Sequence, residues 1–247
     1  MKLTIIGHWG GYPAKGGASS AYLLEKDDFS MMLDFGSSAL SKLLQYKNVT
    51  DIDAVIVSHY HPDHIADIGV LQHAIYVENL LQQQEKVIDI YGHTENEYEF
   101  HKLTHDYTRA IKYRPNDVLQ LGPFFIRFLK TNHTAPCYGM RITDGTSTIV
   151  YTADSAFQEE WIKFSRDADL LLADTNFYAD QDGSEAGHMT SEEVGLIADR
   201  ANVKEVILTH LPHYGNHEQL VEEAAEQFSG KISLAKEGHV WQANNNK

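Results

Sequence analysis

The first half of the chain alternates short apolar runs with polar turns, a pattern that predicts strands and helices in succession. Strands are predicted for "LTIIG", "SSAYLLE", "FSMMLDFG" and "DAVIVS", at residues 3–7, 19–25, 29–36 and 53–58. Apolar residues recur at intervals of three and four in 38–46 and again in 64–84, as they do on one face of a helix. The order of strand, loop and helix after residue 53 is typical of an α/β protein.

The second half continues in the same style. Strands are predicted at 86–92, 124–131, 138–143, 147–154, 170–175 and 205–210, followed by the short runs "ISLA" and "HVWQ". Helices are predicted at 95–111, 191–201 and 217–228. The turn residues "DGT" before residue 147 predict a hairpin, and Thr190 with Glu193 has the spacing of a capping box.

Strands and helices interleave through both halves, with no linker or low-complexity segment between them. The pattern therefore predicts an α/β fold in which two sheets are covered by helices. Residues 1–243 are expected to form a single domain, and residues 244–247 a polar tail.

Composition and charge narrow the choice of partners. The chain has 247 residues, of which 43% are apolar and 22% charged, as in ordinary globular proteins. Its formal net charge of -15 repels long nucleic acid and anionic membrane surfaces. The one cysteine, Cys137, excludes an internal disulfide framework. Without a signal peptide or an apolar run of about 18 residues, a cytoplasmic protein is expected.

Four metal-binding side chains crowd into "SHYHPDH", residues 58–64, directly after a predicted buried strand. His59 and His61 alternate on an extended segment, while Asp63 and His64 follow a proline that turns the chain into a helix. A lone histidine is usually a surface residue or a hydrogen-bonded core residue. Four costly polar groups at the end of a strand are better explained by a metal site, because open α/β sheets bind ligands there.

This motif resembles the His-x-His-x-Asp-His motif of metallo-β-lactamase-fold hydrolases. His133 in "KTNHTAP", Asp154 in "YTADSAF" and His210 in "LTHLPH" stand in contexts that match later ligands of that family. Asp34 in "MLDFG" matches an early aspartate that supports the site without binding metal. The resemblance covers about residues 3–242 and implies a four-layer αββα sandwich, with two mixed sheets packed face to face and helices outside.

The resemblance also implies a binuclear centre. One metal would be held by His59, His61 and His133, the other by Asp63, His64 and His210, with Asp154 bridging the two. Zinc is expected first, with manganese and iron as alternatives. The shared position suits a metal-bridging hydroxide as nucleophile near neutral pH, and Asp63 is expected to be catalytic as well as a ligand.

His188 in "AGHMTSEEV" resembles the His-x-Ser/Thr element of ribonuclease Z, in which the histidine contacts the phosphate and helps the leaving oxygen depart. Such a donor would stabilise the charge that a phosphodiester develops during hydrolysis. Alone, His188 is equally consistent with local hydrogen bonding before a helix. Ribonuclease Z has an acidic partner for this histidine shortly before the bridging aspartate; Val150 offers none here, so the group that orients His188 stays open.

The substrate class follows from what the sequence lacks. Asp154 lies only 21 positions after His133, and one hairpin uses the residues between them, so the long arm with which ribonuclease Z grips transfer RNA is absent. The short spacing resembles the phosphodiesterase of phosphonate breakdown, which opens small cyclic phosphates. We therefore predict a phosphodiesterase that acts on a small anionic substrate, with neither long nucleic acid nor a membrane as partner.

Two rival functions stay open. A thioesterase or lactonase of the glyoxalase II type would use the same metals on a carboxylic ester. A subunit of the same architecture could instead act through protein or RNA contacts without turnover. The apolar helix "VLQHAIYVENLL" offers a patch for a homodimer, although core packing explains it equally well.

Overall fold

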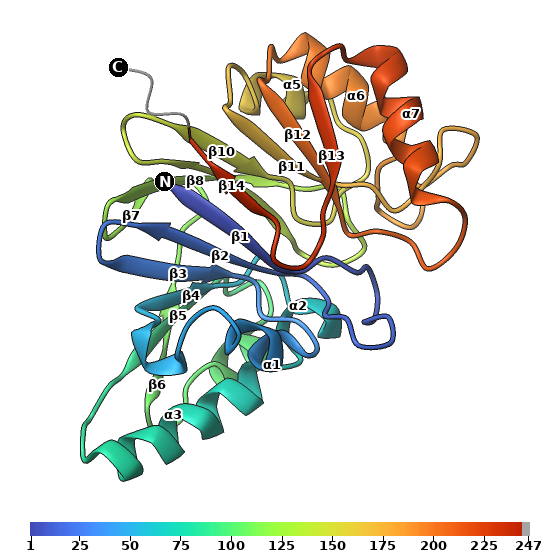
Figure 1. Cartoon of the computed structure of the whole chain (residues 1–247). Coiled ribbons are helices and arrows are strands. Elements are labelled where there is room, and N and C mark those ends of the chain that lie inside the picture. Colours follow the sequence, from blue (N-terminus) through green and yellow to red (C-terminus); the bar gives the residue numbers. More distant parts are fainter. Residues whose placement is uncertain (244–247) are drawn as a thin grey trace. The chain divides into compact units, whose positions relative to one another are not determined.

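The computed structural model describes residues 1–243, which form two compact units. Unit 1 comprises residues 1–114 and 236–242, and unit 2 comprises residues 115–235 and 243. Each unit contains one seven-stranded mixed sheet with helices (Figure 1). The single domain expected over residues 1–243 stays a prediction, and the expected tail at 244–247 lies outside the described residues.

The sheet of unit 1 has the strand order β14-β1-β2-β3-β4-β5-β6. Its strands are β1 (Lys2–Gly7), β2 (Ala21–Lys26), β3 (Phe29–Leu33), β4 (Ala54–Ile56), β5 (Ile88–Gly92), β6 (Thr108–Lys112) and β14 (Val240–Gln242). Strands β14, β1, β2 and β3 pair antiparallel, whereas β3, β4, β5 and β6 pair parallel. The helical segments are α1 (Ala39–Leu43), the 3-10 turn η1 (Val49–Asp51), α2 (Pro62–Ile65), α3 (Ile68–Gln82) and α4 (Glu97–Lys102).

Helices α1 and α3 pack on this sheet through one hydrophobic core. Leu43 of α1 and Leu71 and Ile75 of α3 lie in that core with Val55 and Ile90 of the central parallel strands. All five side chains are fully buried. The segment "SHYHPDH" begins just after the carboxyl end of β4. In open α/β sheets, ligands bind at this end of the parallel strands.

Two predicted helices of unit 1 differ from the structure. The helix predicted over 95–111 is wrong beyond Lys102, because residues 108–112 form β6 and satisfy their backbone groups on β5. The helix predicted over 64–84 is divided into α2 and α3. Asp67 lies at the division, and its carboxylate accepts a hydrogen bond from the Leu40 N–H at 3.0 Å while its own N–H donates to the Phe35 carbonyl.

The sheet of unit 2 has the strand order β13-β12-β11-β10-β9-β8-β7. Its strands are β7 (Leu119–Leu121), β8 (Phe124–Lys130), β9 (Tyr138–Thr143), β10 (Thr148–Tyr151), β11 (Leu170–Asp174), β12 (Glu205–Thr209) and β13 (Lys231–Leu234). Strands β7 to β10 pair antiparallel and β10 to β13 pair parallel. The predicted hairpin is confirmed as β9 and β10.

Three helices pack on the sheet of unit 2: α5 (Glu160–Phe164), α6 (Ser191–Arg200) and α7 (His217–Gln227). Trp161 of α5, Val194 of α6 and Leu220 of α7 share a buried core with Leu171 and Val206 of the parallel strands. The capping box is confirmed, since Thr190 accepts from the Glu193 N–H and Glu193 accepts from the Thr190 N–H. This cap at Thr190, two residues after His188, fixes the start of α6.

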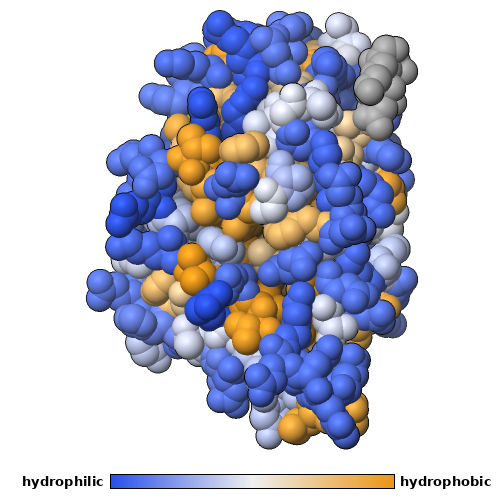
Figure 2. All heavy atoms as spheres, turned by 90° about the vertical axis from the view of Figure 1, so that its left-hand side faces the viewer, coloured by the Kyte–Doolittle hydropathy of each residue, from blue (hydrophilic) through white to orange (hydrophobic). Residues whose placement is uncertain are grey.

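Exposed apolar side chains also occur in the described part of the chain. Helix α3 exposes Val70, Tyr76, Val77, Leu80 and Leu81. On the face shown in Figure 2, hydrophobic residues are interspersed with hydrophilic ones. A homodimer through α3 stays a prediction. None of the described helices combines the length and the apolar composition that crossing a membrane requires.

Candidate metal centre

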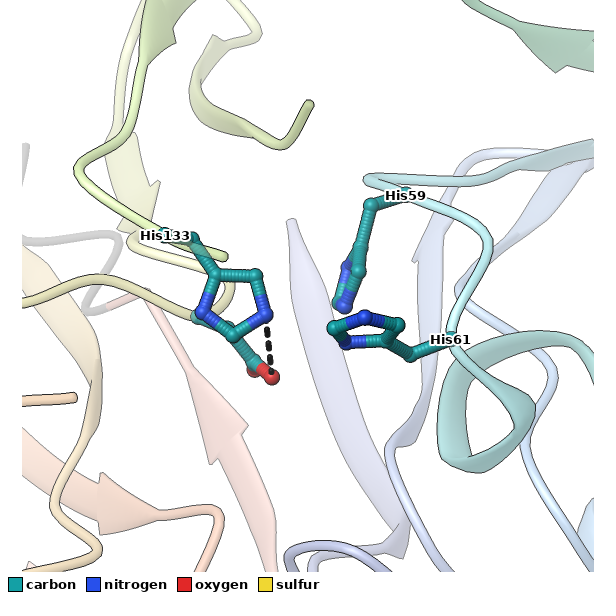
Figure 3. A group of neighbouring side chains, drawn as sticks. His59, His61 and His133 are labelled. Carbon is teal, nitrogen blue, oxygen red and sulfur yellow. Dashed lines mark ion pairs between the residues drawn. The ribbon is translucent and has the colours of Figure 1, made fainter. Parts of the chain in front are cut away.

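Unit 1 brings His59, His61, Asp63 and His64 together on one turn of chain, which we call the unit 1 cluster. His59 and His61 precede α2, and Asp63 and His64 lie in its first turn, which begins at Pro62. Proline suits this position because its ring fixes the backbone angle that a helix start needs. The ring of His59 lies 4.7 Å from that of His61 (Figure 3) and 4.2 Å from that of His64.

Asp34, at the end of β3, orients two histidines of the unit 1 cluster. Its carboxylate accepts hydrogen bonds from His64 Nδ1 at 2.8 Å, from the Ser58 N–H at 2.7 Å and from the Ser58 hydroxyl at 2.8 Å. Ser58 Oγ, having donated its hydrogen to Asp34, accepts from His59 Nδ1 at 3.0 Å. The protons of both rings are thereby placed on Nδ1, so each Nε2 is unprotonated, as a nitrogen that binds metal must be.

The carboxylate of Asp63 is held from a loop distant in sequence. Its Oδ2 accepts a hydrogen bond from the Gly11 N–H at 2.7 Å, and the same oxygen lies 3.6 Å from His64 Nε2. Gly11 has φ +72°, a left-handed conformation that suits glycine. The "GHWGGYPAKGG" turn therefore supplies a backbone donor that fixes one predicted ligand.

Unit 2 brings His133, Asp154 and His210 together, which we call the unit 2 cluster. His210 directly follows β12, Asp154 lies three residues after β10, and His133 lies three residues after β8. Strands β10, β11 and β12 are parallel neighbours, so their carboxyl ends meet at one edge of the sheet. Asp154 Oδ2 lies 3.7 Å from His133 Nε2, drawn as a dashed line in Figure 3, and 3.4 Å from His210 Nε2.

The loop before α6 orients His133. Its Nδ1 lies 2.9 Å from the Gly187 carbonyl, which can only accept, so the ring proton is on Nδ1 and Nε2 faces Asp154. Gly187 has φ +78°, and a Cβ there would lie 2.7 Å from His133 Nδ1. Only glycine allows the backbone to approach this imidazole so closely.

Backbone strain accompanies the candidate ligands in both units. Asp34, Ala153 and His210 have φ values of 55°, 51° and 54°, in the left-handed region that residues with a Cβ seldom occupy. Each such residue costs about 1–2 kcal/mol. Strain of this kind persists only where surrounding contacts enforce it, and it gathers at functional sites.

Asp174, the last residue of β11, supplies the partner of His188. His188 Nδ1 lies 2.7 Å from Asp174 Oδ2, and Asp174 Oδ1 lies 3.3 Å from His210 Nδ1. The rings of His188 and His210 stack with centroids 5.0 Å apart. One ligand atom from each of Asp154, Asp174, His188 and His210 lies within 4.8 Å of the others. The group that orients His188 therefore comes from the strand after the one that contains Val150.

The charges of this pair stabilise each other. Burial disfavours the charged forms of both side chains, but Asp174 outweighs burial and raises the pKa of His188 above its ordinary value. In return His188 and then His210 lower the pKa of the fully buried Asp174 carboxyl despite its burial. A protonated His188 beside an ionised Asp174 can donate a proton from Nε2.

Substitution of Asp174 by asparagine tests this coupling. A general acid works only while protonated, so activity is kept below its pKa and lost as the pH rises through it. D174N removes the charge that raises the pKa of His188 and leaves the burial that lowers it. The alkaline limb of the kcat profile is then expected to move to lower pH, and kcat near pH 8 to fall about 10- to 100-fold. An unchanged profile in metal-replete D174N would contradict the role of Asp174.

The donors of both clusters fit divalent transition metals. Imidazole nitrogens and carboxylate oxygens are the ligands that zinc uses in catalytic sites, and manganese and iron accept the same set. His59 and His64 are fully buried, and Asp63, Asp154 and His210 nearly so. Burial of so many ionisable groups is costly unless they are paired or bind metal.

The chain belongs to the family described as "Beta-lactamase superfamily domain", whose model matches residues 32–211. Over 243 residues it is 52% identical to "Probable metallo-hydrolase YhfI" of Bacillus subtilis, with 98% of this chain and 100% of that protein covered. The crystal structure of YhfI, a metallo-β-lactamase-fold protein, matches with a TM-score of 0.96 over 97% of this chain and 98% of that one. The fold predicted from the motifs is thereby confirmed.

More distant structures share the fold. Human tRNase Z, short form, is 17% identical with a TM-score of 0.76, and 98% of this chain and 99% of that one are covered. A diphosphatase from the PhnP family is 18% identical with a TM-score of 0.78, and 98% of each chain is covered. The sequence resemblance to the ribonuclease Z branch therefore holds for the fold.

Four contributors to the clusters were absent from the sequence-based prediction: Gly11, Ser58, Asp174 and Gly187. Asp174 had a usable signal, since "LLLAD" ends a buried strand in an acidic residue, as "YTAD" does at Asp154. Ser58 and Gly187 act through a hydroxyl and a carbonyl that contact histidines. Serine and glycine are common in loops, so neither residue type indicated a site.

Proposed function

We propose that this chain is a binuclear metal-dependent hydrolase of small or cyclic phosphodiesters. The unit 1 and unit 2 clusters would together hold two divalent metals, zinc first, with manganese and iron as alternatives. One would be bound by His59, His61 and His133, the other by Asp63, His64 and His210, with Asp154 shared. Membership of the family and similarity to YhfI support a hydrolase, and the donor set supports metals.

Phosphodiesters are favoured as substrates by the pairing of His188 with Asp174, beside Asp154 and His210. His188 Nδ1 lies 2.7 Å from Asp174 Oδ2. Bound divalent metals supply an activated water and withdraw charge from phosphoryl oxygens. His188 would donate from Nε2, first as a hydrogen bond to the phosphoryl group and then as a proton to the leaving oxygen. Asp174 would keep the imidazole oriented and protonated until the phosphorus–oxygen bond breaks.

The proposed reaction is the hydrolysis of one phosphorus–oxygen bond by water. Water oxygen forms the new bond to phosphorus, and the leaving oxygen takes the proton of His188. The proton released by the attacking water passes to a carboxylate, for which Asp63, held by the Gly11 N–H, is the candidate. His188 then regains a proton from solvent and Asp63 releases one to it, so both side chains return to their starting states and no reactant besides water and the phosphodiester is needed.

A small substrate is favoured by the net charge of the protein and by the short segment between His133 and Asp154. The formal net charge of -15 opposes binding along many phosphates. Strands β9 and β10 and their turn take up residues 138–151, which leaves little chain between His133 and Asp154 for an extended arm. Compact anions with one phosphodiester group fit these limits best.

Paired rate measurements on the zinc-loaded protein test this function. Bis(p-nitrophenyl) phosphate and a 2′,3′-cyclic mononucleotide are expected to be hydrolysed with kcat/KM at least about a hundredfold above that for an acyl thioester. The reverse preference would favour a thioesterase or lactonase. Turnover of neither class, with fewer than about one metal per chain by elemental analysis, would favour a non-catalytic subunit.

A further inference from the structure

Two arginines lie directly opposite each other on the sheet of unit 2. Arg127 of β8 and Arg141 of β9 are register partners in an antiparallel pair, in which opposed like charges are destabilising. Along β8 the buried side chains are Phe124, Ile126 and Phe128, so Arg127 projects from the opposite face. That face carries α5, whose Trp161 ring contacts the sheet at Gly139.

The arginine pair belongs to a larger group of cations. Lys163 and Arg166, in and just after α5, line the same cavity as Arg127 and Arg141. Among the described residues none of these four cations takes part in an ion pair, whereas Lys42, Lys204 and Lys231 each pair with a carboxylate. Arg141 Nη1 donates to the Phe164 carbonyl at 2.8 Å, which fixes one side of its guanidinium.

Nearby carboxylates do not cancel this charge. Glu160 and Asp167 also line the cavity, which leaves two more cations than anions. Asp167 already accepts from Asn202 Nδ2 at 2.7 Å, and the neighbouring Asp169 pairs with Lys204 at 2.6 Å. Consistent with an excess of positive charge, burial and then Arg127 lower the pKa of Arg141 despite these two aspartates.

The cavity is large enough for a small metabolite and has an apolar wall. Its volume is 580 Å³, within the range of ligand pockets, and Leu129 and Phe164 contribute the apolar surface. A second cavity of 320 Å³ adjoins the same two arginines and adds Phe125, Thr143 and Thr148. The arginine pair therefore lines both cavities, with guanidinium donors for an anion beside apolar side chains.

We propose that the cavity around Arg127 and Arg141 is a second binding site, specific for a nucleoside diphosphate. Two guanidinium groups match phosphate oxygens bidentately, as a lysine pair would not. Lys163 and Arg166 would neutralise remaining phosphate charge, and Phe164 with Leu129 would contact the base. This site contains no residue of the unit 1 or unit 2 clusters, so it stands or fails independently of the proposed hydrolase function.

Isothermal titration of the metal-loaded protein tests the proposal with four probes: AMP, ADP, adenosine and pyrophosphate. ADP is expected to bind most tightly. Adenosine lacks the phosphates that the arginines would bind, and pyrophosphate lacks the base that Phe164 and Leu129 would contact, so each should bind at least about tenfold more weakly. Arg127→Gln is expected to weaken ADP at least about tenfold. Arg127 is exposed, so this variant should fold normally.

A second substitution in the cavity separates charge from geometry, and a substitution in unit 1 serves as the control. Arg141→Lys keeps the charge and loses the planar fork, so it should also weaken ADP at least about tenfold. Arg109→Gln, in unit 1, makes the same charge change as Arg127→Gln at an exposed arginine and should leave ADP affinity within about twofold. The proposal is overturned by absence of ADP binding, by equal affinity for pyrophosphate and ADP, or by binding that survives Arg127→Gln because it occurs at the metals.

Discussion

Substitution of Asp154 by asparagine is expected to remove metal from the protein and to lower kcat on bis(p-nitrophenyl) phosphate at least about a thousandfold. Asp154 is nearly fully buried, and its Oδ2 lies 3.4 Å from His210 and 3.7 Å from His133. It is the one carboxylate proposed to serve both metals. Asparagine keeps the size of the side chain but has no negative charge, so it is a poor bridging ligand.

The measurement for D154N is elemental analysis together with steady-state kinetics. Metal is expected to fall from about two ions per chain to one or fewer, while circular dichroism stays native. Asp180→Asn is the matched control, because Asp180 is exposed on the same unit and outside both clusters. A D154N protein that retained two tightly bound metals and full activity would exclude Asp154 as a shared ligand.

Substitution of His188 by alanine is expected to lower phosphodiester hydrolysis about 10²- to 10⁴-fold while both metals remain bound. His188 donates through Nδ1 to Asp174, and its Nε2 is the atom proposed to serve the substrate. Loss of a general acid matters most when the leaving group is a poor one. The defect of H188A should therefore be larger for an alkyl phosphodiester than for a p-nitrophenyl ester.

This dependence on the leaving group distinguishes proton donation from simple phosphate binding. A histidine that only binds phosphate would give the same loss for every leaving group and mainly a raised KM. His105→Ala is the control, because His105 is exposed and lies outside both clusters. Full activity of metal-replete H188A on both esters would remove the main support for a phosphodiesterase.

The clustering of four candidate donors in one turn is predictable because its information is local. A buried strand, a turn and a proline bring four donors together within "SHYHPDH", whatever the rest of the chain does. His133, Asp154 and His210 could be chosen only by resemblance to a family. Each follows a different strand, and periodicity alone does not determine which strands become neighbours.

The contacts that orient the candidate ligands could not be predicted either, because they also depend on which strands become neighbours. Val150 stands where ribonuclease Z has the acidic partner of its histidine and offers none, and the sequence leaves the partner of His188 open; it is Asp174, on the next strand in the sheet. Parallel pairing of β10 with β11 places that carboxylate beside His188, and strand order is not a local property. The wrong helix at 95–111 has a similar origin, since pairing with β5 outweighs the helical pattern.

Unit 1 is assembled from both ends of the chain, and this has a consequence for biosynthesis. Strand β14 pairs with β1, which starts at residue 2, so the sheet receives its final strand only when residues 240–242 have been translated. Until then one side of β1 lacks its backbone partner, and such an open edge invites pairing with other chains. Residues 8–239 are therefore all translated while this edge of β1 has yet to receive its native neighbour in the sheet.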